Sequence, residues 1–307
     1  MRDTFISALL EHARVDPRIM LITGDLGFGV FDQYRRELPQ QFLNAGVAEQ
    51  NMTGLAAGLA LEGRTVFTYS IGNFPTLRCL EQIRNDVAYH GANVKIVAIG
   101  GGFSYGALGM SHHATEDVAI MRALPGIRVY APCDELETRR LMDCLVANPG
   151  PCYLRLDKSK VSGSENCRFD PASLRCLKEG ADLAIVGYGG ILAEALDSAA
   201  ALAAHGIDCA VYSAHTLKPF DAEGLAAIVR RIPALVTLEE HVSTGGLGGT
   251  AAEVLVRHRI LPERFLSLSL PDAFSSVVGS QEYLRERLEV DAGSITRQIL
   301  KMLERQP

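Results

Sequence analysis

Short apolar runs, rich in β-branched or aromatic residues, alternate with segments of helical periodicity through the first half of the chain. The apolar runs lie at 19–22, 65–68, 94–99, 127–130 and 152–155. The helical patterns lie at about 48–62, 76–90, 115–123 and 134–147, the last one opening with the capping residue Asp134. Buried strands that alternate with helices predict an α/β fold with a mostly parallel sheet.

A second alternation of the same kind follows a polar stretch between Asp157 and about Gly180. Its strand-like runs lie at 183–187, 207–212 and 234–238. Its helical patterns lie at about 191–205, 222–231, 246–258 and 291–304. We therefore predict two α/β domains, each a mostly parallel sheet flanked by helices, over residues 1–160 and 179–307, with a linker at 161–178.

Composition excludes several classes of protein. The 307 residues are 48% hydrophobic, which is enough for two cores, and 30 basic against 36 acidic residues give a formal charge of -6. Without a Lys/Arg-rich run, a nucleic-acid partner is not expected. Seven cysteines are spread singly and no apolar run approaches membrane-spanning length, so we expect a cytoplasmic protein with reduced thiols and no membrane partner.

One glutamate stands at the start of a strongly apolar helical pattern. Glu49 opens the segment 49–61, in which large apolar residues alternate with Ala and Gly residues that allow close packing. Its neighbours in Gly46–Met52 are small and weakly polar, so this carboxylate is expected to lose part of its hydration. Two roles are open: an acid that complements the helix dipole, or a carboxyl group whose proton takes part in chemistry.

A long glycine-rich loop, 100–117, follows the third apolar run and contains paired histidines. Its glycines allow close approach of the backbone to a ligand. His112 and His113, at the start of a predicted helix, are candidates for proton transfer because such an imidazole tends to stay neutral near pH 7. A structural role is the alternative. No metal site is expected, because adjacent histidines point in different directions and no third ligand is spaced nearby.

Other candidate residues follow predicted strands directly. Asp25, in Gly24-Asp25-Leu26-Gly27, lies where ligands bind in open α/β sheets, or it caps a turn. Phe74 offers a ring on which a flat cofactor could stack, or it fills the core. The run Gly245–Gly249 opens a helix and resembles a phosphate cradle, but no Gly-x-Gly-x-x-Gly occupies the first βαβ position.

Taken in order, these segments resemble the transketolase and deoxyxylulose-phosphate-synthase family. The resemblance rests on the Asp25 turn, the Glu49 segment, the Phe74 helix entry, the loop to His112, Pro151–Arg155, Leu217–Asp221, Thr237–His241 and Gly245–Gly248. It covers nearly the whole chain and corresponds to the pyrimidine-binding and C-terminal domains. The family's Gly-Asp-Gly…Asn motif, which holds diphosphate and Mg²⁺, is absent, because Leu26 stands at the second glycine and Asn51 is in a different context.

The resemblance implies a cofactor, thiamine diphosphate, and roles for four residues. Glu49 matches a glutamate that hydrogen-bonds N1′ of the aminopyrimidine and favours the tautomer that removes the thiazolium C2 proton. Phe74 matches the aromatic residue that stacks on the pyrimidine, His112 a histidine that contacts substrate and moves its hydroxyl protons, and Asp25 an aspartate near the thiazolium.

The resemblance also implies a partner. The chain is similar to the C-terminal subunit of a split transketolase, a transferase that acts on ketose and aldose substrates. An N-terminal subunit with Gly-Asp-Gly…Asn would hold the diphosphate and Mg²⁺ in an α₂β₂ assembly. The alternatives are the β subunit of a 2-oxo acid dehydrogenase E1 component and a catalytically silent scaffolding subunit.

Departures from the family concern the substrate. Transketolases carry an aspartate that recognises a sugar hydroxyl at the position of Leu108 in this chain. At the position of Gly100–Gly102 they carry a basic residue that binds the sugar phosphate. A standard pentose phosphate is therefore not expected. Arg155 or Lys158 could anchor an anionic tail, alongside contacts from His112 and His113, or could pair with a surface acid.

Overall fold

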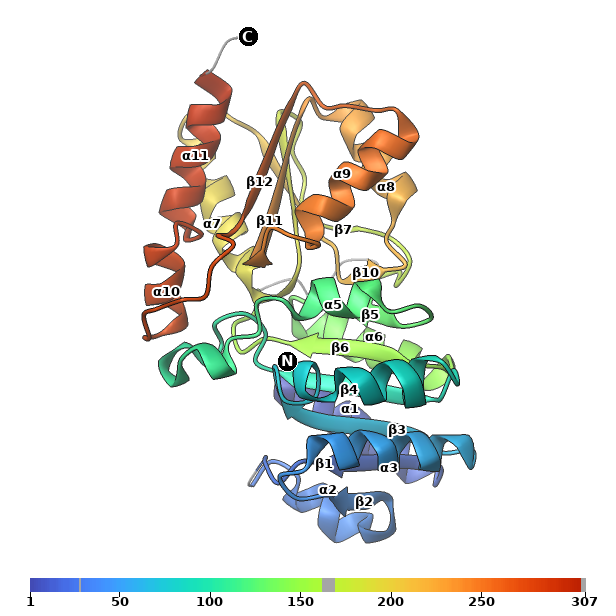
Figure 1. Cartoon of the computed structure of the whole chain (residues 1–307). Coiled ribbons are helices and arrows are strands. Elements are labelled where there is room, and N and C mark those ends of the chain that lie inside the picture. The colour runs from blue at the N-terminus through green and yellow to red at the C-terminus, as the bar shows by residue number, and fades with distance from the viewer. Residues whose placement is uncertain (28, 162–168, 305–307) are drawn as a thin grey trace.

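Two sheets, one above the other, organise the chain. The computed structural model describes residues 1–27, 29–161 and 169–304 (Figure 1). A seven-stranded sheet has the order β10-β5-β6-β4-β3-β1-β2, and a five-stranded sheet has the order β12-β11-β8-β9-β7. All described strand pairs are parallel except β10 with β5 and β7 with β9. The predicted fold class is confirmed.

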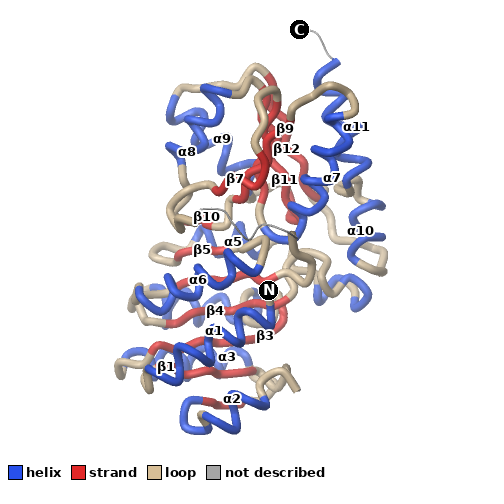
Figure 2. The backbone as a smooth tube through the Cα atoms, turned by 180° about the vertical axis from the view of Figure 1, so that it is seen from behind, coloured by secondary structure: helices blue, strands red, loops and turns tan. Residues whose placement is uncertain are grey.

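The first sheet is covered on both faces. Its strands are β1 (Ile19–Thr23), β2 (Phe42–Asn44), β3 (Thr65–Ile71), β4 (Val94–Ile99), β5 (Arg128–Tyr130), β6 (Cys152–Leu156) and β10 (Thr216–Lys218). One face packs against α1 (Arg2–Val15) and α6 (Glu135–Ala147), which lie in front of it in Figure 2. The other packs against α3 (Glu49–Leu61) and α5 (Asp117–Ala123). Short helices α2 (Asp32–Glu37) and α4 (Leu80–Gln82) lie in the connections.

The second sheet is also a three-layer unit. Its strands are β7 (Arg175–Lys178), β8 (Leu183–Gly187), β9 (Cys209–Ser213), β11 (Ala234–Val242) and β12 (Arg264–Leu270). Helices α7 (Leu192–Ala203) and α11 (Ala292–Glu304) cover one face, and α8 (Ala222–Arg231) and α9 (Leu247–His258) cover the other (Figure 1). Helix α10 (Gln281–Arg287) follows a long loop after β12.

The structure differs from the predicted organisation at several elements, among them strands β2 and β12 and helices α2 and α10, which were not predicted. Residues 175–178, placed in the linker, form β7, because they pair antiparallel with β9; residues 162–168 of that linker lie outside the described residues. Strand β10, from beyond the predicted boundary, completes the first sheet. The segment at 76–90 is no single helix: α4 has 3 residues and leads into a π-helical segment, Ile83–Ala88. The domain limits themselves stay a prediction.

Two buried arginines, each paired with acids, link the two domains. Arg155 of β6 lies 3.4 Å from Asp117 and 3.7 Å from Asp157, and donates to the carbonyl of Glu240 in the second domain. Arg175 of β7 reaches back to Asp134 at 2.7 Å and Glu137 at 3.1 Å, at the start of α6. We call these two groups the junction ion pairs. Among the described residues, no helix has the length and apolarity needed to cross a membrane.

Candidate active site

The carboxyl edge of the first sheet gathers most of the predicted site residues. Because β1, β3 and β4 run parallel, the segments that follow them, with Asp25, Phe74 and the glycine-rich loop, emerge at one edge. Helix α3 begins there with Glu49, after the turn that leaves β2. The topology thus accounts for the convergence of residues that lie far apart in the sequence.

Glu49 is a buried carboxylate held between two segments. Its side chain is 2% exposed, and a Cβ added to Gly24 would lie 3.4 Å from its Cγ and 3.6 Å from Oε1. Gly24 therefore lets the β1 turn pack directly against the carboxyl group. The other oxygen, Oε2, accepts a hydrogen bond of 2.8 Å from Nη1 of Arg78. The Arg78 side chain is 46% exposed, so one partner of this pair is fixed and the other is open to solvent.

A continuous row of contacts runs from Glu49 to the histidine loop. The guanidinium carbon of Arg78 lies 4.6 Å from the centre of the Phe74 ring. The Phe74 ring meets the His112 ring at a centroid distance of 5.1 Å and an interplanar angle of 68°. The structure therefore brings Glu49, Phe74 and His112 together, with Arg78 as the link between the first two.

A cavity of about 530 Å³ opens beside this row. The first domain lines it with Phe74, Arg78, His113 and Glu116, and the second domain lines it with the loop after β12, which includes Phe274. It has the size of a small-molecule site, with apolar walls and a few convergent polar groups. The cavity lies at the mouth of the Glu49 site.

The two histidines have different surroundings. His112 is partly exposed, and burial followed by the charge of His113 lowers its pKa below the ordinary value, so it is neutral near pH 7. The predicted placement of His112 at the start of a helix was wrong, since α5 begins only at Asp117 and His112 ends a short 3-10 helix, Met110–His112. His113 is 3% exposed and its Nε2 hydrogen-bonds the carbonyl of Gly106 at 3.1 Å, which fixes Nε2 as the donor.

Asp25 is exposed and held in an unusual backbone conformation. Its φ is 56°, in the left-handed region that few residues other than glycine adopt. Asn44 holds it there: the Asp25 N–H donates to Asn44 Oδ1 at 3.0 Å and Asn44 Nδ2 donates to Asp25 Oδ1 at 2.9 Å. Asn44 also accepts from the N–H of Gly46 at 3.0 Å, which ties the Asp25 turn to the segment leading into Glu49.

Arg155 is not placed to contact a substrate. Its side chain is 1% exposed and surrounded by Asp117, Asp157 and the ring of Tyr188. A guanidinium already neutralised in the interior cannot take an anionic tail in the cavity, so the geometry argues against the predicted role. Lys158 is also engaged, because its Nζ lies 3.7 Å from the centre of the Tyr105 ring.

The glycine runs serve contacts within the chain. A Cβ on Gly101 would lie 2.1 Å from Arg155 Nε, and one on Gly102 would lie 2.3 Å from Glu240 Oε1, so these glycines make room for the domain junction. The cradle at the start of α9 holds Glu239, whose carboxylate accepts from the N–H groups of Leu247 at 2.7 Å and Gly248 at 3.0 Å. The Glu239 carboxylate therefore occupies the position at the start of α9 where a phosphate would bind.

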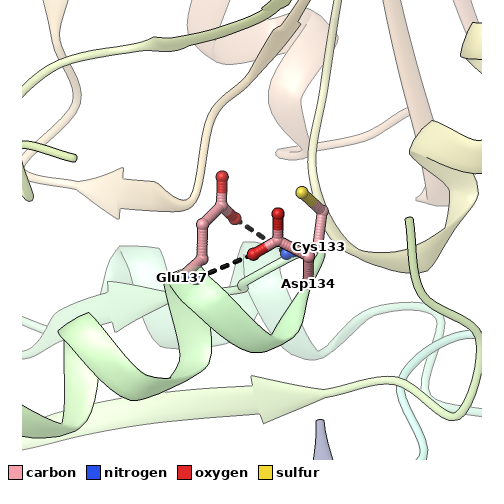
Figure 3. Close-up of side chains that lie close together, drawn as sticks. All are labelled: Cys133, Asp134 and Glu137. Atoms are coloured by element: carbon pink, nitrogen blue, oxygen red, sulfur yellow. Dashed lines mark hydrogen bonds between the residues drawn. The ribbon is translucent and has the colours of Figure 1, made fainter. Parts of the chain in front are cut away.

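One cluster has the composition of a metal site. Cys133, Asp134 and Glu137 present ligand atoms within 4.8 Å of one another (Figure 3). The two carboxylates pair with Arg175, and Glu137 also accepts from the Cys133 N–H at 2.8 Å and the Ser213 hydroxyl at 3.1 Å. The guanidinium supplies the positive charge that a cation would bring, and this cluster is part of the junction.

Sequence reasoning missed two residues of the site. Arg78 lies in the segment where a regular helix was predicted, and only the fold reveals that it reaches back to Glu49. Asn73 lines the cavity and donates through Nδ2 to the His113 carbonyl, while its Oδ1 is buried without a partner among the described residues. Its position immediately before Phe74, after a strand, was the signal that could have identified it.

Comparisons with known proteins agree with this geometry. Residues 1–163 match the family described as "Transketolase, pyrimidine binding domain" and residues 172–295 match "Transketolase, C-terminal domain". A relative from Clostridium sp. (strain MSTE9), 6-deoxy-6-sulfo-D-fructose transketolase subunit SqwH, is 37% identical over 99% of this chain and 95% of the relative. An apulose-4-phosphate transketolase subunit from Phocaeicola vulgatus is 33% identical over 99% of this chain and 97% of the relative.

A solved structure is similar along its whole length. The protein described as "Split gene transketolase, inactive beta4 tetramer" superposes with a TM-score of 0.89 at 35% identity, and the match covers 98% of this chain and 97% of that one.

Proposed function

The chain belongs to the transketolase family, and from this premise we propose that it is the C-terminal subunit of a split, thiamine-diphosphate-dependent transketolase. It transfers a two-carbon ketol unit between sugars or related substrates. The observation that carries the proposal is the buried Glu49 carboxylate, set next to Phe74 at the sheet edge of a chain that matches transketolase subunits from end to end.

The residues present fit the pyrimidine half of the cofactor. Glu49 offers a buried acceptor for N1′, and the Phe74 ring lines a cavity and can stack on a flat ring. The orphaned Oδ1 of Asn73 offers a further acceptor. When bound, the cofactor supplies the carbon that accepts the ketol unit. The protein's part is to orient the ring through Phe74 and to hold a proton at the Glu49 carboxyl group.

The histidine loop faces the substrate in this proposal. His112, neutral near pH 7, can accept or donate a proton at a substrate hydroxyl. His113 lines the cavity and its Nε2 proton is engaged by Gly106, so it anchors the loop at the cavity wall. Asp25, on the β1 turn, would contribute near the thiazolium, as the resemblance to the family implies.

The diphosphate and Mg²⁺ are assigned to a partner chain. The Gly-Asp-Gly…Asn motif that holds them in the family does not occur in this sequence. Relatives of the same length are named as subunits, and a homologous structure is described as an inactive beta4 tetramer. These names support an N-terminal partner subunit, self-association and an α₂β₂ assembly whose site lies between subunits.

The other two functions considered are not favoured. The full-length relatives described above are transketolase subunits, and none of the three similar proteins is a dehydrogenase component. A silent scaffold would have no need for the buried Glu49 and its alignment with Phe74.

The test is reconstitution. This chain and an N-terminal transketolase subunit with Gly-Asp-Gly…Asn are mixed with thiamine diphosphate, Mg²⁺ and a panel of ketose donors. We expect ketol transfer only when both chains are present, and a loss of about 10²- to 10⁴-fold with Glu49→Gln in an assembly of unchanged size. Full turnover by Glu49→Gln, or by either chain alone, would rule the proposal out.

A further inference from the structure

Arg78 makes two contacts that the proposed function assigns to the cofactor. Its guanidinium donates to Glu49 Oε2 at 2.8 Å, and its carbon lies 4.6 Å from the centre of the Phe74 ring. A guanidinium is planar and donates from its edge, so it can stack on an aromatic face and hydrogen-bond a carboxylate together. An aminopyrimidine held by Glu49 and Phe74 would compete with the guanidinium for this carboxylate and for the ring face that the guanidinium covers.

We propose that Arg78 occupies the pyrimidine position of the unliganded subunit and must leave it before the cofactor binds. This inference rests on the proposed function, because it takes Glu49 and Phe74 as the pyrimidine contacts. Arg78 is then a positioning residue that sets the affinity for the cofactor: while its side chain covers Phe74 and engages Glu49, neither residue is available to the ring.

The surroundings allow the exchange. Arg78 is 46% exposed, whereas Glu49 is 2% exposed, so the guanidinium can move into water while the carboxylate stays in place. Arg78 also lines the cavity of about 530 Å³, which gives the displaced side chain room, and the carboxylate of Glu116 lines the same cavity. Its two described partners are the ones the ring would replace. Leaving them costs the free subunit one ion pair and one ring contact, and the bound ring restores contacts to Glu49 and Phe74.

Occupation of the pyrimidine position by Arg78 should change the measured affinity for the ring. A ligand that binds only the open fraction of a site has an apparent dissociation constant raised in inverse proportion to that fraction. Removing the guanidinium should therefore tighten binding of the ring, which is the opposite of what loss of a ligand-binding arginine would do. The sign of the change separates the two roles.

The first experiment uses the full chain alone and the cofactor's aminopyrimidine fragment, 4-amino-5-hydroxymethyl-2-methylpyrimidine, with binding followed by ligand-observed NMR. We expect Arg78→Met to bind the fragment at least about fivefold more tightly than the unmodified chain. Arg78→Lys, which keeps the charge but lacks the planar group, should lie between them and guards against a folding defect in Arg78→Met. Arg84→Met is the matched control, because Arg84 lies in the same connection and hydrogen-bonds only Asn85 among described side chains.

The second experiment measures thiamine diphosphate binding to the assembly with the partner subunit and Mg²⁺ by calorimetry. Tighter binding by Arg78→Met, with Arg84→Met unchanged, supports the inference in both experiments. Equal or weaker fragment binding by both Arg78 variants overturns it, as does the absence of fragment binding by every variant. If the assembly binds the cofactor and turns over while the Arg78 variants show no tightening, the inference fails and the proposed function stands. If no assembly binds the cofactor, both fail.

Discussion

Arginine–carboxylate pairs occur in two settings in this molecule. In the junction ion pairs, Arg155 and Arg175 face acids of the first domain, and no side chain in these pairs is more than 5% exposed. At the candidate site, Glu49 is 2% exposed but Arg78 is 46% exposed. Arginine–carboxylate pairs are therefore fully buried at the junction, whereas the pair at the sheet edge has its arginine side exposed to solvent.

The difference separates a structural role from an exchangeable one. A buried guanidinium paired with buried acids can move away only if the surrounding structure opens. Its removal by mutation leaves the acids buried without a partner of opposite charge. A guanidinium with one side in water can be displaced at a much smaller cost. We infer that the junction holds the two domains in register, while the Glu49 pair holds a place for a ligand.

The largest effect is expected at the junction. Arg175→Met removes the charge that faces Asp134 and Glu137 and should lower the free energy of unfolding by about 3–5 kcal/mol in urea denaturation. The exposed Arg84→Met should change it by less than about 0.5 kcal/mol. A loss below about 1 kcal/mol for Arg175→Met would show that the junction ion pairs do not hold the domains together.

The junction should also respond to acid. Burial, followed by the charge of Arg175, lowers the pKa of His215 to about 4. Between that value and the unfolded value of about 6.5, His215 binds more protons in the unfolded chain than in the folded one, so its contribution to stability falls as pH falls through this window, by about 3 kcal/mol in all. Unfolding titrations from pH 7 to pH 4 should show this slope, and His215→Gln should reduce it. An equal slope in the variant would assign the acid sensitivity elsewhere.

The Arg78–Glu49 pair should contribute less to the free energy of unfolding than the junction ion pairs do. Arg78→Met should lower the free energy of unfolding by about 1–2 kcal/mol, because water from the cavity can reach the Glu49 carboxylate once the guanidinium is gone. A double-mutant cycle with Glu49→Gln should give a coupling of about 1 kcal/mol. A loss as large as that of Arg175→Met would remove the contrast between the two regions.

The smallest effect is expected on cofactor binding when the Phe74 ring is removed. Phe74→Ala should weaken thiamine diphosphate binding to the assembly by about 2- to 12-fold, corresponding to about 0.5–1.5 kcal/mol of stacking. Phe274→Ala is the control, since Phe274 lines the same cavity from the second domain and is 72% exposed. If Phe274→Ala weakens binding more than Phe74→Ala does, the ring site lies on the other wall of the cavity.

The sequence predicted the α/β class and most elements because their apolar periodicity is strong. Strands β4 and β8 were predicted at their observed limits, and Asp134 caps α6 as expected, accepting from the Glu137 N–H. Strands β2, β7, β10 and β12 were missed, and each is stabilised by pairing with a strand distant in the sequence; β7 and β10 are also short and antiparallel. Local pattern carries no information on such pairing.

The site was predicted unevenly for a related reason. Glu49, Phe74 and His112 follow strands or open a helix, so topology brings them together as the motif order suggested. Arg155 looked like an anion ligand, but Asp117 and Asp157 enclose its guanidinium, and the contact with Asp117 depends on the fold. Arg78 could not be assigned, since its role depends on a contact 29 residues away.

The most direct test of the account is the rate at which the thiazolium C2 proton of thiamine diphosphate exchanges with deuterium in the assembled enzyme. This measurement requires no knowledge of the donor or acceptor sugar. We predict exchange that is fast with the unmodified chain and slower by about 10²- to 10⁴-fold with Glu49→Gln at saturating cofactor. Equal exchange rates for the two proteins would contradict the role of Glu49 and, with it, the proposed function.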